Sequence, residues 1–131
     1  MDYVSSLGTN YTIREMGKVL SLGEYAKTDN LLEDLSKAAR WISPEYETLK
    51  GAKYQPLGEV RLKGDQKIPI RVIGFHDRTK KEFQILIVCW HKDDRYKPAE
   101  CLDTAADRYK IFIKGNATKK EHFNDDDEET E

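Results

Sequence analysis

The sequence predicts an α+β fold, in which a small antiparallel meander sheet packs with N-terminal helices and a C-terminal helix. Three observations predict it. Apolar residues repeat at helical spacing from Thr28 to Ile42, three short strand-like segments separated by polar turns lie between Gly58 and Trp90, and a second helical pattern follows between Pro98 and Gly115. With 131 residues, the chain has the length of one domain with a modest core.

We expect residues 1–123 to form that domain, with residues 1–27 as its least defined segment, and residues 124–131 to form a disordered acidic tail. Six of the 24 acidic residues lie in 125–131, so the rest of the chain carries 18 acidic and 22 basic residues and is basic despite the overall charge of −2. A run of acidic residues buries no apolar surface, which predicts disorder. The tail either solvates the chain end or covers the basic surface in competition with nucleic acid.

Hydropathy and cysteine usage predict a cytoplasmic protein that does not enter a membrane. The sequence contains no apolar run of bilayer length and does not open with a signal peptide. Cys89 falls in an apolar strand and Cys101 early in a helix, so we expect both to be packing residues rather than a disulfide or metal ligands.

The two expected N-terminal helices differ in how clearly the sequence pattern predicts them. Thr9 and Asn10 could cap a first helix, whose apolar face would be Ile13, Met16, Val19 and Leu20, or Tyr3 and Val4 could enter a strand. The next helix is clearer: Thr28 and Asp29 offer N-cap chemistry. Its apolar face would be Leu31, Leu32, Leu35, Ala38, Ala39 and Ile42, and Pro44 would end it.

The middle and end of the chain supply the sheet and the last helix. After a connector over 44–56 with a possible helical turn, strands are expected at Gly58–Leu62, Ile68–Phe75 and Phe83–Trp90, with turns at 63–66 and 76–81. The last strand is nearly all apolar and should be central. Pro98 suits the first position of the final helix and Gly115 its C-terminal cap. The apolar stripe of that helix would be Leu102, Ala105, Ala106, Tyr109, Phe112 and Ile113.

Basic side chains at strand ends make RNA the leading substrate class, because Arg and Lys can hold a phosphate backbone. The sequence has no glycine-rich phosphate loop, His/Cys metal cluster or Gly-x-Ser-x-Gly elbow. We therefore expect chemistry that needs no metal and no cofactor.

The order and spacing of these segments resemble the RelE/ParE superfamily of bacterial toxins, in particular its HigB-like, phage-derived branch. The resemblance covers roughly residues 30–113. It rests on Glu59-Val60-Arg61, on Ile70-Arg71-Val72 continuing to Phe75, on Ile85–Trp90, on Lys92-Asp93, and on Pro98 and Ala105. Asp93 departs from the paired lysines of the family, which puts full catalytic competence in question, although Arg95 and Lys97 partly restore the charge.

The resemblance implies a type II toxin that inhibits translation by cutting mRNA on the ribosome, with a cognate antitoxin, the ribosome and mRNA as partners. In such a reaction the RNA 2′-OH attacks the adjacent phosphate. Arg71, and after it Arg61, would stabilise the phosphorane. We expect Arg71 and Lys92 to converge on one phosphate over one face of the sheet.

The other candidates are assigned in the same way. His91 would act as general acid or base, and Tyr96 would stack on a base or donate a proton. Arg95, Lys97 and Lys63 would bind the RNA backbone. Each residue also has an ordinary alternative: a solvated cation, a salt bridge to Glu59, or, for Tyr96, packing against the last helix.

A second function remains open, namely a binding protein on the same fold without nuclease activity. It would inhibit a target such as gyrase by contact or serve a phage as an interaction module. Asp93 and the acidic tail favour it.

Overall fold

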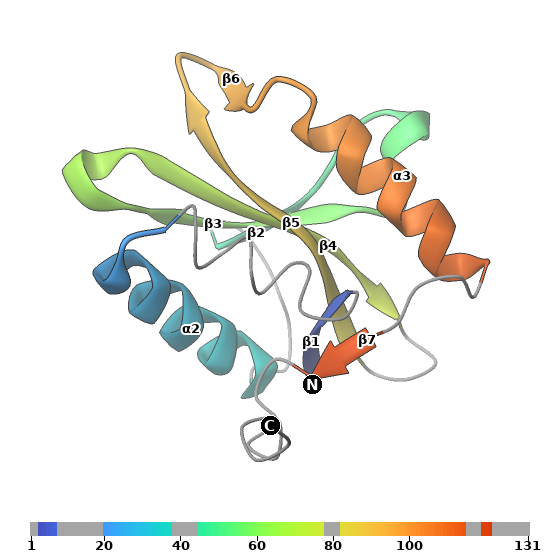
Figure 1. The fold of residues 1–131 in the computed structure, drawn as a ribbon, viewed down its shortest axis with the longest axis horizontal. Helices are drawn as coiled ribbons and strands as arrows, with labels where there is room; N and C mark the ends of the chain where they lie inside the picture. The colour runs from blue at the N-terminus through green and yellow to red at the C-terminus, as the bar shows by residue number, and fades with distance from the viewer. Residues whose placement is uncertain (1–2, 8–19, 38–44, 78–81, 115–118, 122–131) are drawn as a thin grey trace, which may run out of the picture.

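A computed structural model describes residues 3–7, 20–37, 45–77, 82–114 and 119–121. The described part is α+β, as predicted, with one sheet between two helices (Figure 1). The helices are α2 (Leu22–Lys37) and α3 (Cys101–Ile113). The strands and short 3-10 helices are β1 (Tyr3–Leu7), β2 (Tyr46–Thr48), η1 (Ala52–Tyr54), β3 (Gly58–Lys63), η2 (Asp65–Lys67), β4 (Pro69–Asp77), β5 (Glu82–Lys92), β6 (Arg95–Lys97) and β7 (Lys119–Glu121).

The predicted antiparallel meander is present, and it forms the centre of a larger sheet. The strand order is β2-β3-β4-β5-β1-β7, and β6 pairs with the far end of β5. Strand β5 is central, as its apolar sequence predicts. The strand alternative for Tyr3 and Val4 is confirmed, but β1 pairs with β5 in parallel, which the meander prediction did not include. Strands β2 and β6 were also not predicted as strands, whereas the expected helical turn of the connector is present as η1.

Alternating side chains of the central strands build a separate core on each face of the sheet. The core on the α2 face contains Leu20, Leu32, Leu35, Tyr46, Val60, Ile70, Val72, Phe83, Ile85 and Val88. The core on the α3 face contains Leu49, Leu57, Ile73, Phe75, Leu86, Ile87, Cys89, Cys101, Ala105 and Ala106. Tyr109 packs against this second core, as predicted, with its ring 4.8 Å from that of Phe75.

Helix α2 begins earlier than predicted, because Ser21 and Glu24 form a capping box ahead of Thr28. The Ser21 hydroxyl accepts a hydrogen bond from the Glu24 N–H at 3.1 Å, and the Glu24 carboxylate accepts one from the Ser21 N–H at 2.9 Å. Thr28 is therefore not an N-cap; it lies buried inside the helix and donates its hydroxyl to the Glu24 carbonyl. Glu24 also accepts the Asp65 N–H at 2.6 Å, which fixes the helix start to the β3–β4 turn.

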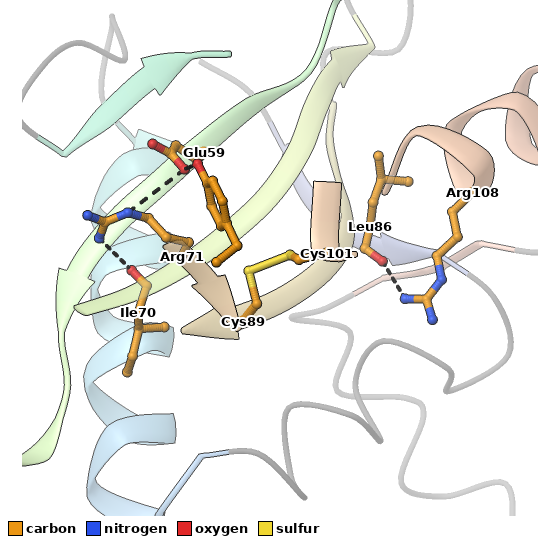
Figure 2. The surroundings of a disulfide bond; sticks show 8 residues. Glu59, Ile70, Arg71, Leu86, Cys89, Cys101 and Arg108 are labelled. Carbon is orange, nitrogen blue, oxygen red and sulfur yellow. Dashed lines mark hydrogen bonds and ion pairs between the residues drawn. A yellow bond between two sulfur atoms is a disulfide. The ribbon is translucent and has the colours of Figure 1, made fainter. Parts of the chain in front are cut away.

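A β-bulge interrupts the pairing of β4 with β5. Ile73 pairs with Ile87 and Gly74 with Ile85, so Leu86 has no partner on β4. A side chain at Gly74 would collide with the backbone carbonyl of Gln84, so the bulge requires glycine here. Arg108 of α3, 8% exposed, donates to the Leu86 carbonyl at 2.7 Å (Figure 2).

The last helix also departs from prediction at its start and on its apolar stripe. It begins at Cys101 rather than at Pro98, and Ile113, expected on the buried stripe, is 58% exposed. Several expectations lie outside the described residues: the first helix with its caps, the end of the helix at Pro44, the cap at Gly115 and the acidic tail.

Candidate active site

The candidate site is built on Glu59, a buried carboxylate in β3. Its side chain is 3% exposed and accepts a hydrogen bond at Oε2 from Arg61 Nε at 2.8 Å, and Arg61 Nη2 lies 2.7 Å from the same oxygen in an ion pair. A hydrogen bond between a guanidinium and a carboxylate is charge-assisted and stronger than one between neutral groups, and this one leaves the second oxygen, Oε1, for other partners. A buried carboxylate is tolerated only with such partners, so Glu59 and Arg61 depend on each other.

Arg71 approaches the same carboxylate from the neighbouring strand. Its Nε lies 3.8 Å from Glu59 Oε1, too far for a hydrogen bond, and its Nη1 donates to the Ile70 carbonyl at 3.1 Å (Figure 2). The Nε atom is buried and has no hydrogen-bond acceptor among the described residues. Burial lowers the pKa of Arg71, and the negative charge of Glu59 acts in the opposite direction.

The two guanidinium groups face each other across the ladder, because Arg61 and Arg71 are direct partners in the β3–β4 register. Like charges directly opposite on adjacent strands are destabilising. Glu59 offsets part of this repulsion, but Arg71 remains incompletely bonded. Such an arrangement is typical of a site that receives a further anion.

Tyr96 of β6 also contacts the carboxylate of Glu59. Its hydroxyl donates to Glu59 Oε1 at 2.6 Å. Burial raises the pKa of Tyr96 well above the ordinary value of 10.0, and the hydrogen bond to Glu59 raises it further, so the phenol keeps its proton. His91 of β5 is the direct strand partner of Tyr96, and the two rings meet edge to face with 4.8 Å between their centroids. We call Glu59, Arg61, Arg71, Tyr96 and His91 the Glu59 cluster.

An open cavity of about 340 Å³ borders the Glu59 cluster, a volume within the range of about 300–1,000 Å³ usual for ligand sites. It is lined by Glu47, Thr48, Leu49, Lys50, Tyr54, Glu59, Arg61, Tyr96 and Leu102. Arg71 and His91 belong to the Glu59 cluster but do not line the cavity. One wall is fixed by Tyr54, whose hydroxyl donates to Asp103 of α3 at 2.9 Å. That hydrogen bond raises the pKa of Tyr54. The pKa of Asp103 is lowered, first by a hydrogen bond from Lys53 and then by the one from Tyr54.

The expected convergence of Arg71 with Lys92 is wrong. Arg71 is directly opposite Cys89 on β5, so these two side chains share the α3 face. Lys92 lies three residues beyond Cys89 on the same strand, and successive side chains of a strand alternate between faces. Lys92 therefore projects to the α2 face, away from the Glu59 cluster.

Two of the three expected RNA-binding residues lie on the same face of the sheet as Lys92. Arg95 is the strand partner of Lys92, and Lys97 that of Trp90, which places all three exposed cations on the α2 face of the β5–β6 hairpin. Lys63 is exposed at the end of β3, and its carbonyl accepts a hydrogen bond from Lys27 at 3.2 Å. Of the eight predicted site residues, the structure brings together Arg61, Arg71, His91 and Tyr96.

Cys89 and Cys101 form a disulfide, which corrects the expectation that they are separate packing residues. The bond joins the end of β5 to the first residue of α3, with a Cα–Cα distance of 6.7 Å (Figure 2). This bond could not be predicted from the sequence, because it depends on where α3 begins and how it returns over the sheet. Cys89 is also the strand partner of Arg71, so the disulfide lies beside the Glu59 cluster.

The central role of Glu59 was not predicted from the sequence, which indicated it only as a salt-bridge partner for an arginine. The alternation Glu59-Val60-Arg61 carried the signal, because it places a carboxylate and a guanidinium on one face of a strand. Glu47 was missed as well; it is the direct strand partner of Glu59 across the β2–β3 ladder.

The chain matches no protein-family model, no curated protein and no solved structure. Across the described ranges, no group of three or more His, Cys, Asp and Glu side chains could hold a metal ion. Neither α2 nor α3, the two α-helices in the part of the chain that the structure describes, is long and apolar enough to cross a membrane.

Proposed function

We propose that the chain cleaves RNA by attack of a ribose 2′-OH on the adjacent phosphate, and that it acts as a RelE-like, HigB-like toxin on mRNA at the ribosome. One observation carries the proposal: a buried carboxylate, two guanidinium groups and a phenol converge on one face of the sheet beside an open cavity. These groups supply a proton acceptor and positive charge for a phosphorane.

The roles follow from the geometry of the Glu59 cluster. A phosphate entering the cavity competes with Glu59 for Arg61, whose side chain is 39% exposed and lines the cavity. Glu59, released from part of this pairing, accepts the 2′-OH proton as the 2′-oxygen bonds to phosphorus. Arg61, which lines the cavity, contacts the phosphorane, and Arg71, which does not line it, adds positive charge from the neighbouring strand.

The leaving group needs a proton when the bond between phosphorus and the 5′-oxygen breaks. His91 is assigned this proton, because an imidazole can serve as a general acid and its ring packs edge to face on Tyr96 beside the carboxylate. The products are a 2′,3′-cyclic phosphate and a 5′-hydroxyl. A cognate antitoxin that covers the cavity, the ribosome as partner and a cytoplasmic location belong to the same proposal.

The test is cleavage of a 5′-labelled RNA, free and on translating ribosomes. Wild-type protein should release products ending in 2′,3′-cyclic phosphate, and RNA with 2′-O-methyl groups should stay intact. Glu59→Gln keeps the side-chain shape and should lower the rate on the order of 10²- to 10⁴-fold by removing the proton acceptor. Arg71→Gln should lower it on the order of 10²- to 10³-fold.

The control is Glu33→Gln, which removes one exposed carboxylate from α2, away from the site. It should cleave like the wild type, and thermal melting should show that all variants are folded. Full activity of folded Glu59→Gln protein would remove Glu59 from the reaction. Absence of cleavage by the wild type, both free and on ribosomes, would reject the proposal.

A second candidate is the binding protein without nuclease activity, inhibiting a target such as gyrase by contact. The position of Lys92, Arg95 and Lys97 favours it, because three exposed cations on the face opposite to the cluster form a surface suited to an acidic partner. Under this proposal RNA remains intact, while charge reversal of Arg95 and Lys97 abolishes inhibition of the target and Glu59→Gln does not.

A further inference from the structure

The cavity beside the Glu59 cluster has a second part that the proposed chemistry does not use. The lining residues outside the Glu59 cluster include the acidic Glu47, the aromatic Tyr54 and the apolar Leu49 and Leu102. A nucleotide whose phosphate lies at Arg61 would place its sugar and base in this part. Proteins commonly recognise single-stranded RNA in this way: a base leaves its stack and binds in a pocket of the protein.

Glu47 is the polar group that can read such a base. It lies directly opposite Glu59 on the neighbouring strand, an arrangement of like charges that is destabilising unless cations offset it. Arg61 lies between the two carboxylates but is committed to Glu59, at 2.7 and 2.8 Å, whereas Glu47 is 3.8 Å from Arg61 Nη1. The Glu47 side chain is 38% exposed and lines the cavity, and its ion-pair partner among the described residues, Arg61, is beyond hydrogen-bond distance.

An ionised carboxylate only accepts hydrogen bonds, and it accepts two from adjacent parallel donors best. Guanine has two such donors side by side, the N1–H and the 2-amino group. Adenine and cytosine set an acceptor beside their amino group, and uracil sets acceptors on both sides of its single N–H. The acceptors of these three bases would face the carboxylate and be repelled.

We infer that this part of the cavity is a guanine-binding site, in which Glu47 accepts hydrogen bonds from the guanine edge and Tyr54, Leu49 and Leu102 contact the base. The site selects RNA that carries guanine immediately before the cleaved bond. This inference deepens the proposed RNA cleavage and rests on it for its biological meaning. The binding of a guanine nucleotide can nevertheless be measured without any cleavage.

The test uses four RNA oligonucleotides in which every ribose except one carries a 2′-O-methyl group. The single free 2′-OH belongs to guanosine, adenosine, cytidine or uridine. In parallel, binding of the four nucleoside 3′-monophosphates is measured by calorimetry. Guanosine should be preferred in both assays on the order of 10- to 100-fold, the discrimination of one good bidentate contact to a base.

Glu47→Gln should remove the preference for guanosine, while Glu33→Gln, with the same loss of charge on α2, should retain it. Equal cleavage after all four bases, unaffected by Glu47→Gln, would overturn the guanine site and leave RNA cleavage standing. Guanosine 3′-monophosphate binding that depends on Glu47, with no cleavage of any RNA, would support the site and reject the nuclease. Failure of both assays would overturn both.

Discussion

At the scale of single residues, the bulge between β4 and β5 leaves the Leu86 carbonyl without a strand partner, and the side chain of Arg108 donates to it instead. Arg61, Arg71, His91 and Tyr96 could be selected from the sequence because strand-end cations and aromatics suit RNA chemistry. Arg108 could not, since its partner is a carbonyl left unpaired by a bulge, which the sequence indicates only through the isolated Gly74. The same bulge helps to set the β4–β5 register that separates Lys92 from Arg71.

Arg108 should therefore be important for stability. Arg108→Met keeps the length and most of the apolar contact but leaves the buried Leu86 carbonyl without this donor. An unsatisfied buried polar group costs about 1–3 kcal/mol, so urea unfolding should show a loss of that size. Lys110→Met, at an exposed position of the same helix, should change the free energy of unfolding by less than about 0.5 kcal/mol. Equal losses in the two variants would show that the carbonyl is satisfied without Arg108.

At the scale of elements, apolar patterns predicted the strands β3, β4 and β5 and both described helices, because these elements bury whole faces. Short edge elements escaped prediction: β2 and β6 have three residues each, too few to show alternation. The start of α2 was misplaced for another reason. Ser21 and Glu24 are a capping box in the sequence, but Thr28 and Asp29 offered competing cap chemistry next to the clearest apolar repeat.

The disulfide between β5 and α3 gives a prediction at this scale. Cys89 and Cys101 are 12 residues apart, and closing a loop of that size stabilises a protein by about 2–4 kcal/mol. Reduction with dithiothreitol should lower the midpoint of urea unfolding accordingly, and the double variant Cys89→Ala, Cys101→Ala should show the same loss and no response to reductant. Because disulfides are rare in the cytosol, RNA cleavage should be measured in both redox states. An unchanged midpoint on reduction would show that the bond does not stabilise the fold.

At the scale of the whole molecule, the sheet separates two groups of charged side chains. Its α3 face carries the Glu59 cluster and the cavity, and the α2 face of its β5–β6 hairpin carries Lys92, Arg95 and Lys97. The α+β class could be predicted because it depends only on the order of helical and strand patterns. The division of charges between faces could not, because a shift of one residue in register exchanges the faces.

The coupling of the Glu59 cluster to global stability should be visible at alkaline pH. The pKa of Tyr96 is raised in the folded protein, chiefly by burial and then by Glu59. Between pH 10 and this raised pKa, the unfolded chain therefore binds fewer protons than the folded protein. The stabilisation from the protonated phenol is complete below pH 10 and is lost as the pH rises further. Urea unfolding from pH 9 to pH 11.5 should therefore show a falling free energy, and the fall should be smaller in Tyr96→Phe. Tyr54→Phe removes a half-buried phenol whose pKa is raised first by its hydrogen bond to Asp103, outside the Glu59 cluster, and gives the comparison. If Tyr96→Phe lost stability with pH as steeply as the wild type, Tyr96 would not be the group that links the cluster to the fold.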